Sequence, residues 1–325
     1  MNYIVFDLEW NQCPYGKSRE VRELPFEIIE IGAVKLNEKK EILDSFHALV
    51  RPKVYKKLHF QTMKVIGLRD SDLRKGTAFE IAAEKFLKWC GSEPKFCTWG
   101  PQDLFELQRN LEFYGMEELL PGPIFYEDVQ KLFAIAYENR RERRALSYAV
   151  DFLHLPAEEN FHLAEADAEY TAGIFQLIPG EIIEKYYSID CYRNPKSVRE
   201  EIHVRYDYYE KYISRPFETK EMLMADREVR AIRCFECGRR LRPTVRWFSD
   251  SAAKNHYAVG NCPEHGFVKS KIRVREASDG SFYAVRTTRL ITEEDLAEIR
   301  SKQTAIRLKR QSRRRAAASQ PGRKS

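Results

Sequence analysis

The chain opens with Met1-Asn-Tyr-Ile-Val-Phe-Asp-Leu-Glu-Trp10, and this stretch predicts both a core strand and a site. Tyr3 to Phe6 is short, apolar and rich in β-forming residues, as is typical of a buried strand. Because side chains alternate along a strand, Asp7 and Glu9 point to the same face, about 6–7 Å apart. Two adjacent carboxylates repel each other unless a cation lies between them. The stretch therefore predicts either a divalent-metal site or two solvated acids beyond a strand that ends at Phe6.

Three further polar residues follow at the boundaries of predicted elements. Asp103 comes just after a short apolar strand and would lie in the first turn of the next helix. The common role of aspartate at that position is to cap the helix. His162 and Asp167 form an H-x4-D pair that opens a helix predicted to end at Leu177. Small residues along this helix favour close packing on a sheet, and a lone histidine or aspartate there is usually structural.

The order of these residues is more informative than any one of them. The sequence contains a D-x-E pair that ends the first strand, an aspartate after a mid-domain strand and a late H-x4-D motif; the residues are Asp7, Glu9, Asp103, His162 and Asp167. This order resembles that of the DEDDh 3′–5′ exonucleases, a branch of the ribonuclease H-like superfamily. The resemblance covers about residues 1–180 and implies an α/β fold, with a mixed β-sheet flanked by helices.

Two positions near the motifs bear on the substrate. Trp99-Gly100 before Asp103 is more similar to family members that trim histone mRNA and small RNAs than to DNA-proofreading members. Many members carry threonine two residues after the glutamate, where it helps to seat the terminal nucleotide; this chain has Asn11 there. The resemblance thus favours RNA over DNA, and the change at Asn11 leaves substrate preference open.

The resemblance also implies a mechanism. Two divalent ions about 3.5–4 Å apart neutralise charge on the attacking and leaving oxygens of a phosphodiester. Carboxylate oxygens suit Mg²⁺ or Mn²⁺. By resemblance, Asp7 bridges both ions, Glu9 and Asp167 complete one metal site, and Asp103 supports the second. His162 is then the general base for the attacking water, because the pKa of histidine is ordinarily near neutrality.

Two flanking features have alternative interpretations. Leu8 and Trp10 neighbour the acids and are candidates for substrate binding: Leu8 otherwise packs in the core, and Trp10 is a candidate to stack on the terminal base. Residues 138–144 contain four arginines. This segment is either a solvated helix face or a phosphate-contacting surface beside the active site.

A second metal site is indicated in the C-terminal half. The sequence has a C-x2-C pair and a C-x2-H pair separated by 24 residues, formed by Cys234, Cys237, Cys262 and His265. Two such knuckles around a β-rich spacer fit one tetrahedral, structural Zn²⁺. We therefore expect a small β-rich, zinc-ribbon-like domain over residues 231–290. The alternatives are free thiols in an ordinary β subdomain, or His256 as a substitute ligand.

The remaining segments differ in composition. Residues 181–230 alternate tyrosines and charged residues, and we expect a helical connector there. Residues 291–325 are expected to form a short helix and a disordered basic tail. Since the whole chain carries +6 and residues 301–325 carry +9, the rest carries −3. The tail is therefore expected either to bind nucleic acid non-specifically or only to aid solubility.

Composition limits the class of protein. The sequence has no apolar run of about 18 residues and no basic, apolar leader, so we expect a cytoplasmic protein without a membrane span. Seven cysteines, mostly scattered, argue against a disulfide framework. The sequence predicts a metal-dependent 3′–5′ exonuclease acting on single-stranded 3′ ends of RNA or DNA. The alternative is a catalytically weak nucleic-acid-binding adaptor that uses the zinc ribbon and the basic tail.

Overall fold

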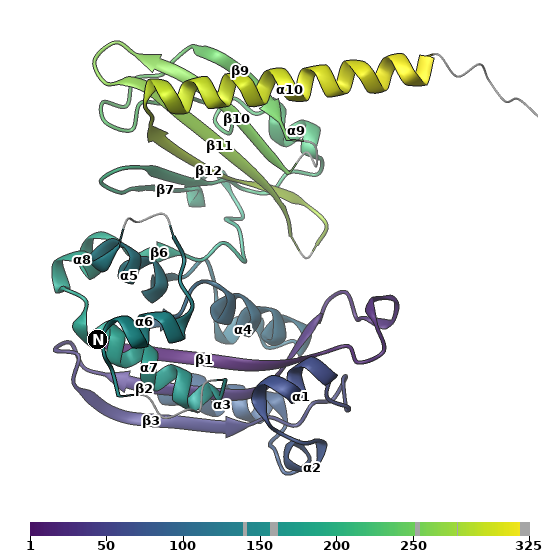
Figure 1. The fold of residues 1–325 in the computed structure, drawn as a ribbon. Helices are drawn as coiled ribbons and strands as arrows, with labels where there is room; N and C mark the ends of the chain where they lie inside the picture. The colour runs from purple at the N-terminus through teal and green to yellow at the C-terminus, as the bar shows by residue number, and fades with distance from the viewer. Residues whose placement is uncertain (139–141, 157–161, 251–253, 278, 319–325) are drawn as a thin grey trace, which may run out of the picture. The chain divides into compact units, whose positions relative to one another are not determined.

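The chain forms two compact units, Met1–Tyr192 and Arg193–Ser325. The structure, a computed structural model, describes residues 1–138, 142–156, 162–250, 254–277 and 279–318. Figure 1 shows both units, and each is described by itself below. Among the described helices, none combines the length and the apolar character that crossing a membrane requires.

The first unit is built on a six-stranded mixed sheet with the order β3-β2-β1-β4-β5-β6. Its strands are β1 (Asn2–Gln12), β2 (Phe26–Leu36), β3 (Ile42–Leu49), β4 (Pro94–Thr98), β5 (Phe125–Asp128) and β6 (Ser188–Ile189). The first three strands form an antiparallel meander, and β4 pairs in parallel with β1. β1 therefore lies in the middle of the sheet, as expected for an apolar opening strand.

Helices cover both faces of this sheet (Figure 1). They are α1 (Phe60–Ile66), α2 (Asp70–Leu73), α3 (Phe79–Cys90), α4 (Gln102–Phe113), α5 (Val129–Tyr137), α6 (Leu146–Phe152), α7 (Ala164–Leu177) and α8 (Gly180–Lys185). Ile4, Phe6 and Leu8 of β1 form one core with buried residues of α3 and α4. On the other face of β1, the ring of Tyr3 lies 4.9 Å from that of Phe175 in α7. The sheet is thus enclosed by helices, as the ribonuclease H-like prediction requires.

The segment after residue 25 differs from our expectation. We expected a helical turn over its first residues, and the structure has the single strand β2 over the whole of Phe26–Leu36. Most of β2 is buried, because it lies between β1 and β3 under helices on both faces. A strand that is buried on both faces has a continuous apolar run without alternation, and periodicity does not separate such a run from a buried helix.

The second unit is a six-stranded sheet with the order β7-β8-β12-β11-β10-β9. Its elements are β7 (Ile202–Arg205), β8 (Glu210–Ile213), α9 (Lys220–Ala225), β9 (Pro243–Ser249), β10 (Asn255–Cys262), β11 (Gly266–Glu276), β12 (Phe282–Leu290) and α10 (Glu293–Ala318). In Figure 1, α10 lies over β9 and β10 and then continues past the sheet. Leu296 and Ile299 of α10 pack there against Val245 and Val259.

Two expected segments differ from the structure. Residues 181–230 were expected to be a helical connector, yet β7 and β8 lie within them. β8 pairs with β12 of the second sheet, and β7 pairs with β8 at its edge. The tyrosine-rich pattern there comes from a half-buried strand, in which Tyr212 is fully buried. The basic tail was expected to be disordered beyond a short helix, but α10 continues to Ala318. Its Leu, Ala, Lys and Arg content favours a helix, because these residues have high helix propensity.

Candidate active site and metal centre

The central part of β1 places the first two acids on the face opposite the core formed with α3 and α4. Phe6 and Leu8 are buried in the core, whereas Asp7 and Glu9 alternate with them and are partly exposed. β2 pairs with β1 across Asp7 and Glu9, and the register shifts by a β-bulge just after Glu9. The strand thus continues through both acids, and the alternative of a strand that ends at Phe6 is wrong.

Asp103 lies in the first turn of α4 and points to β1. The side chain is 5% exposed, and its Oδ1 accepts a hydrogen bond of 3.2 Å from the backbone N–H of Leu8. The helix N-cap is Pro101, so Asp103 does not have the capping role that is common for aspartate at a helix start. Instead the hydrogen bond joins the start of α4 to the strand residue between Asp7 and Glu9.

Asp167 and His162 approach the same place from the start of α7. The backbone N–H of His162 donates to Oδ2 of Asp167 at 3.3 Å. Ligand atoms of Glu9, His162 and Asp167 all lie within 4.8 Å of one another. Asp167 is 8% exposed, and its Oδ1 is buried without a hydrogen-bond partner among the described residues. A buried carboxylate oxygen without a donor is suited to a cation.

Burial and a neighbouring acid raise the pKa of each of the four acids. Burial raises the pKa of Asp7 well above its usual range, and the charges of Asp103, Asp167 and Glu9 raise it further. The pKa of Glu9 is raised to about 8, first by burial and then by the charge of Asp167. Burial is also the main cause that raises the pKa of Asp103 to about 7. Such repulsion among close carboxylates destabilises the site unless protons or cations are bound. The donor set and the charge therefore fit divalent metal ions.

These shifts predict how stability depends on pH when the active site holds no metal. Because the pKa values of Glu9 and Asp103 are raised to about 8 and about 7 in the folded state, the folded chain binds protons more tightly than the unfolded chain. The protonated forms of Glu9 and Asp103 contribute their whole stabilisation below about pH 4. This contribution is lost as the pH rises through their folded-state pKa values. We expect the thermal unfolding midpoint, measured without Mg²⁺ or Mn²⁺, to decrease as the pH is raised from 5.5 to 8.5.

Added Mn²⁺ is expected to restore the midpoint at the upper pH, and Glu9→Gln is expected to flatten the dependence. The clustering of the acids would be contradicted if the wild-type midpoint stayed constant or rose across this pH range and matched the midpoint of Glu9→Gln.

Glu30 is a fifth acid at this site that the sequence analysis missed. It is 3% exposed and lies directly opposite Glu9 in the β1–β2 register. Its Oε1 lies 2.8 Å from Nε2 of His47, and its Oε2 accepts from the N–H of Ala164 at 3.4 Å. Glu30 thereby joins β2 to the first residue of α7. Sequence alone does not give strand register, and no motif marks this residue.

Gly32 allows α7 to approach the sheet next to the acids. Gly32 pairs with Asp7 in the β1–β2 register. A Cβ atom added to Gly32 would lie 2.1 Å from the carbonyl carbon of Ala164, which is backbone. The start of α7, with Asp167 one turn later, is therefore held at a distance that only glycine permits.

Gly32→Ala is expected to displace the start of α7. Overpacking of this kind costs about 1–3 kcal/mol, and the displacement moves Asp167 away from Asp7. We expect a lower unfolding midpoint in denaturant and a large loss of hydrolysis. Gly173→Ala is the matched control in the same helix, because its Cβ would make an ordinary contact of 3.5 Å with Leu155. Equal behaviour of the two variants would contradict the close packing at Gly32.

The residues that flank the acids have different surroundings. Leu8 is 2% exposed within the core. The core alternative therefore holds for its side chain, and a substrate contact of Leu8 stays a prediction. Trp10 is partly buried, and its ring centroid lies 5.9 Å from that of Phe26. Whether Trp10 also contacts a base stays a prediction.

Asn11 lies where many family members have threonine, and its side chain is buried and hydrogen-bonded within the protein. Its side chain is 0% exposed. The amide nitrogen donates to the carbonyl oxygens of Tyr55 and Lys57, at 2.9 and 2.8 Å, and Oδ1 accepts from the N–H of His59. Asn11 therefore fixes the loop before α1, which is a structural role that the sequence does not reveal.

The arginine-rich segment is only partly described. Arg140 and Arg141 lie outside the described residues. Arg144 forms ion pairs with Glu138 and Glu142, at 3.0 and 2.6 Å, and Arg143 lies 3.6 Å from Asp128. The described arginines thus have acidic partners within the protein, and residues 142–145 form a loop between α5 and α6, not the expected helix face. A phosphate contact of this segment stays a prediction.

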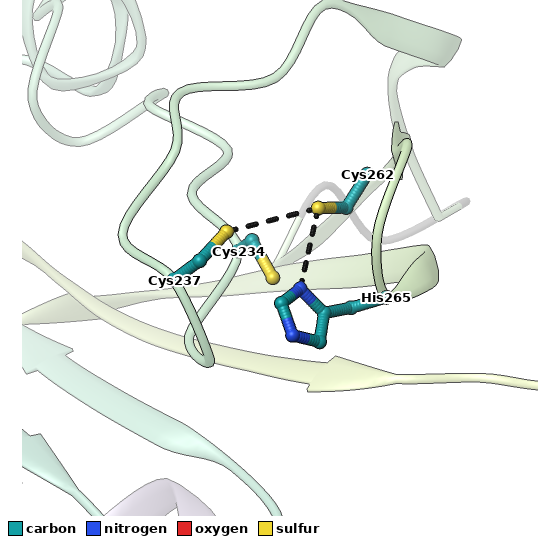
Figure 2. A group of neighbouring side chains, drawn as sticks. All are labelled: Cys234, Cys237, Cys262 and His265. Atoms are coloured by element: carbon teal, nitrogen blue, oxygen red, sulfur yellow. Dashed lines mark hydrogen bonds between the residues drawn. The ribbon is translucent and has the colours of Figure 1, made fainter.

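The four predicted zinc ligands converge in the second unit, as Figure 2 shows. Their ligand atoms lie within 4.8 Å of one another. The Sγ atoms of Cys237 and Cys262 are 3.7 Å apart, and Sγ of Cys262 is 3.5 Å from Nδ1 of His265. A tetrahedral zinc with Zn–S near 2.3 Å and Zn–N near 2.0–2.1 Å separates its ligands by about 3.8 Å (S to S) and 3.5 Å (S to N). The observed spacing therefore fits zinc and does not fit a disulfide.

Each knuckle is a tight turn that places two ligands. Cys262 pairs with Gly266 at the end of the β10–β11 hairpin, so Cys262 and His265 lie in the hairpin turn. The other knuckle is closed by a hydrogen bond of 2.7 Å from the N–H of Gly238 to the carbonyl oxygen of Cys234. Gly238 and Gly266 both have positive φ, +70° and +81°, as expected for such turns.

The surroundings of Cys262 favour the thiolate, which is the species that binds zinc. Burial acts to raise the pKa of Cys262, but hydrogen bonds with His265, the nearby backbone and Cys237 lower it to about 6. His256 is not part of the cluster found among the described residues; it lies within β10 and pairs with Ile272. The alternative in which His256 is a zinc ligand is therefore not supported.

The fold and the acid cluster define a class, the ribonuclease H-like nucleases. The model of the RNase_T exonuclease family matches residues 4–175. Because this match covers more than half of the chain, the chain belongs to that exonuclease family, with the DEDDh set of residues in place. Comparison with curated proteins gave no match.

Several solved structures are similar to this chain. The nuclease domain of 3′hExo, a DEDDh family member solved with rAMP, is 20% identical with a TM-score of 0.50, and the match covers 58% of this chain and 97% of that one. Cell-death related nuclease 4 (CRN-4) is 18% identical with a TM-score of 0.45, covering 58% and 66%. Exonuclease I of E. coli, in complex with a dA16 oligonucleotide, is 11% identical with a TM-score of 0.40, covering 84% and 54%. At such identities the likeness to 3′hExo concerns the fold.

Proposed function

We propose that the chain is a metal-dependent 3′–5′ exonuclease that hydrolyses single-stranded 3′ ends, with RNA preferred over DNA. One observation supports this most strongly. Four acids from β1, α4 and α7 each have a pKa raised by burial and by a neighbouring acid, within a family of exonucleases. No role in packing explains four clustered carboxylates that repel one another, whereas the binding of divalent cations does.

Each acid has a proposed role at the metal ions. Two Mg²⁺ or Mn²⁺ ions would be held by these acids, with Asp7 contributing to both sites, Glu9 and Asp167 to one, and Asp103 to the other. The free, buried Oδ1 of Asp167 supports this arrangement. When bound, the ions neutralise the phosphate charge and make a nucleophile available at neutral pH. Leu8 donates its N–H to Asp103, and Glu30 accepts from the N–H of Ala164; these two hydrogen bonds position Asp103 and the start of α7 for this role.

His162 is the proposed general base. It is exposed, has a positive φ of +72°, and lies with Glu9 and Asp167 in one group. Neutral imidazole accepts a proton from the attacking water, whose oxygen forms a bond to phosphorus while the scissile P–O bond breaks. The leaving oxygen then takes a proton from solvent. Exposure of the ring gives the accepted proton a path to solvent.

His162→Ala is expected to lower kcat by about 10²–10⁴-fold, the usual contribution of a general base. Mn²⁺ binding, measured by calorimetry, is expected to stay largely unchanged because the acids are intact. The wild-type rate is expected to rise with pH, because a general base acts only in its unprotonated form. A wild-type rate that does not change between pH 6 and pH 8 would count against this role.

The preference for RNA is the finer part of the proposal. It rests on Trp99-Gly100 before Asp103, and the matching nuclease domain of 3′hExo is described as bound to rAMP. Trp10 is proposed to stack on the terminal base, since aromatic side chains do so in single-strand channels. The variant Trp10→Ala tests this contact, and the quantity to measure is its KM for a short oligonucleotide.

A panel of labelled oligonucleotides tests the proposed function. RNA and DNA, single- and double-stranded, are each offered with the 3′ or the 5′ end blocked, in Mn²⁺ or EDTA. The expected result is release of nucleotides from free 3′ ends of single strands, fastest for RNA, and none in EDTA. Degradation that ignores a 3′ block would contradict the polarity. Binding without hydrolysis would favour the adaptor alternative.

We further propose one structural Zn²⁺ at Cys234, Cys237, Cys262 and His265. The spacing of the ligand atoms and the lowered pKa of Cys262 support it. Such a site closes the two knuckles onto each other and contributes directly to folding.

A further inference from the structure

The sheet of the second unit has two faces of different character. Alternate residues of β11 are buried, and Ile272 packs in one core with Leu223 and Val229, which lie in or just after α9. Val268, on the same face, packs with Cys234 beside the zinc knuckle. This face is therefore closed by the segment that precedes β9. The residues of β11 that alternate with these buried ones are not in these cores and point to the opposite face of the sheet.

Cations gather on that opposite face. β11 presents Lys269, Lys271 and Arg273, which are partly or fully exposed. The strand register places Tyr257 of β10 opposite Lys271, and Arg289 of β12 opposite Lys269. Lys302 of α10 also lies on this face. We call the following set of residues the basic face: Tyr257, Lys269, Lys271, Arg273, Arg289 and Lys302.

Tyr257 holds three of these ammonium groups around its ring. The Nζ atoms of Lys302, Lys269 and Lys271 lie 4.3, 5.8 and 5.9 Å from the ring centroid. Lys302 reaches this position because Ile299, one turn earlier in α10, is buried on the same face of the sheet. Attraction between a cation and an aromatic ring orders the lysines before any ligand binds.

The charge of the basic face is not balanced by its own strands. Among the described residues of β10, β11 and β12, the positions on this face include five cations and no acid. The positions are Asn255, Tyr257, Val259, Asn261, Phe267, Lys269, Lys271, Arg273, Arg275, Tyr283, Val285, Thr287 and Arg289. The pKa of Lys269 is lowered by burial and by the charges of Arg289, Lys271 and Lys302, and Asp295 of α10 acts in the other direction. A polyanion would offset this repulsion.

We propose that the basic face binds the phosphodiester backbone of a single-stranded nucleic acid. Successive cations of β11 are about 6.6–6.8 Å apart along the strand, which presents them as a row to a chain of phosphates. The inference rests on the proposed exonuclease function, because that function makes nucleic acid the polyanion that this chain encounters. The basic face then adds affinity for long substrates beyond what the active site supplies.

The test compares binding of a fluorescein-labelled single-stranded 30-mer by two full-length variants, in buffer without Mg²⁺ or Mn²⁺. Lys269→Gln/Lys271→Gln/Arg273→Gln is expected to weaken binding about tenfold or more. Each lost phosphate contact is expected to reduce the slope of log K against log salt by about 0.7, so the slope falls by about 2. The control Lys39→Gln/Lys85→Gln/Lys88→Gln removes three exposed charges from the first unit and is expected to bind like the wild type.

Lys302→Gln/Arg289→Gln is a second variant at exposed positions, and it keeps the test valid if the triple variant does not fold. A smaller loss of affinity is expected from it. Unchanged affinity and salt dependence in a folded basic-face variant would overturn the proposal. So would stronger competition by polyglutamate or phosphatidylserine vesicles than by unlabelled oligonucleotide.

A small substrate separates this proposal from the proposed function. The p-nitrophenyl ester of thymidine 5′-monophosphate occupies only an active site, and its hydrolysis is expected to be equal in the wild type and the basic-face variants. Absence of hydrolysis in the wild type would speak against the proposed function. Equal hydrolysis with equal 30-mer binding would speak against the basic face alone.

Discussion

Asp7→Asn is expected to abolish hydrolysis, with a fall in kcat of at least about 10³-fold, and to leave the fold intact. Loss of a single group that stabilises transition-state charge already costs about 10²–10³, and Asp7 is proposed to bind both ions. The pKa of Asp7 is raised by burial and by four neighbouring acids. Removing its charge therefore relieves repulsion in the metal-free chain. We expect a higher thermal unfolding midpoint than the wild type without Mg²⁺ or Mn²⁺.

Asp44→Asn is the matched control for this substitution. Asp44 lies on the exposed strand β3, and its Oδ2 accepts from the indole N–H of Trp89. This variant is expected to retain hydrolysis. Full turnover by Asp7→Asn in Mg²⁺ would remove the two-metal account. A fall in the midpoint of metal-free Asp7→Asn would show that the acids stabilise the chain without a cation.

Removal of the zinc ligand Cys262 is expected to have the largest effect on stability. Structural zinc supplies about 10–16 kcal/mol of apparent binding free energy in small zinc-binding peptides. Cys262→Ser is therefore expected to lose the zinc and to unfold the sheet around β9 and β10 at much lower denaturant concentration. Metal analysis and hydrogen exchange in β9–β12 measure these two effects. Hydrolysis of the mononucleotide ester, which needs only the first unit's site, is expected to remain.

Cys191→Ser is the control, since Cys191 lies in the first unit, outside the zinc cluster. It is expected to retain one zinc per chain and the exchange pattern of β9–β12. A wild type without zinc would contradict the site, as would one equivalent of zinc in Cys262→Ser.

The sequence predicted those parts of the active site that depend on chain order. Asp7 and Glu9 follow from alternation along a buried strand, and Asp103, His162 and Asp167 were found through their order in a known family. Glu30 and Gly32 were missed, because their roles depend on the register of β2 against β1 and on the approach of α7. Neither quantity is local in sequence. Asn11 was recognised as a departure, but its three hydrogen bonds to residues 55–59 require the fold.

The second unit was predicted less completely. The spacing of cysteines and histidine predicted the cluster at Cys234 and Cys262, because knuckles are local turns. The sheet around it is larger than a zinc ribbon, since β7 and β8 join it from a segment expected to be helical. Short strands rich in tyrosine and charge give no clear alternation when only one or two residues, such as Tyr212, are fully buried.

The central claim is that Asp7, Glu9, Asp103 and Asp167 together hold divalent cations. Calorimetric titration of Mn²⁺ into the zinc-loaded chain, with a nucleoside 5′-monophosphate present, tests it most directly. The account predicts two Mn²⁺ ions per chain in the wild type and the loss of at least one in Asp103→Asn. Absence of Mn²⁺ binding in the wild type, or identical titrations of the two proteins, would contradict it.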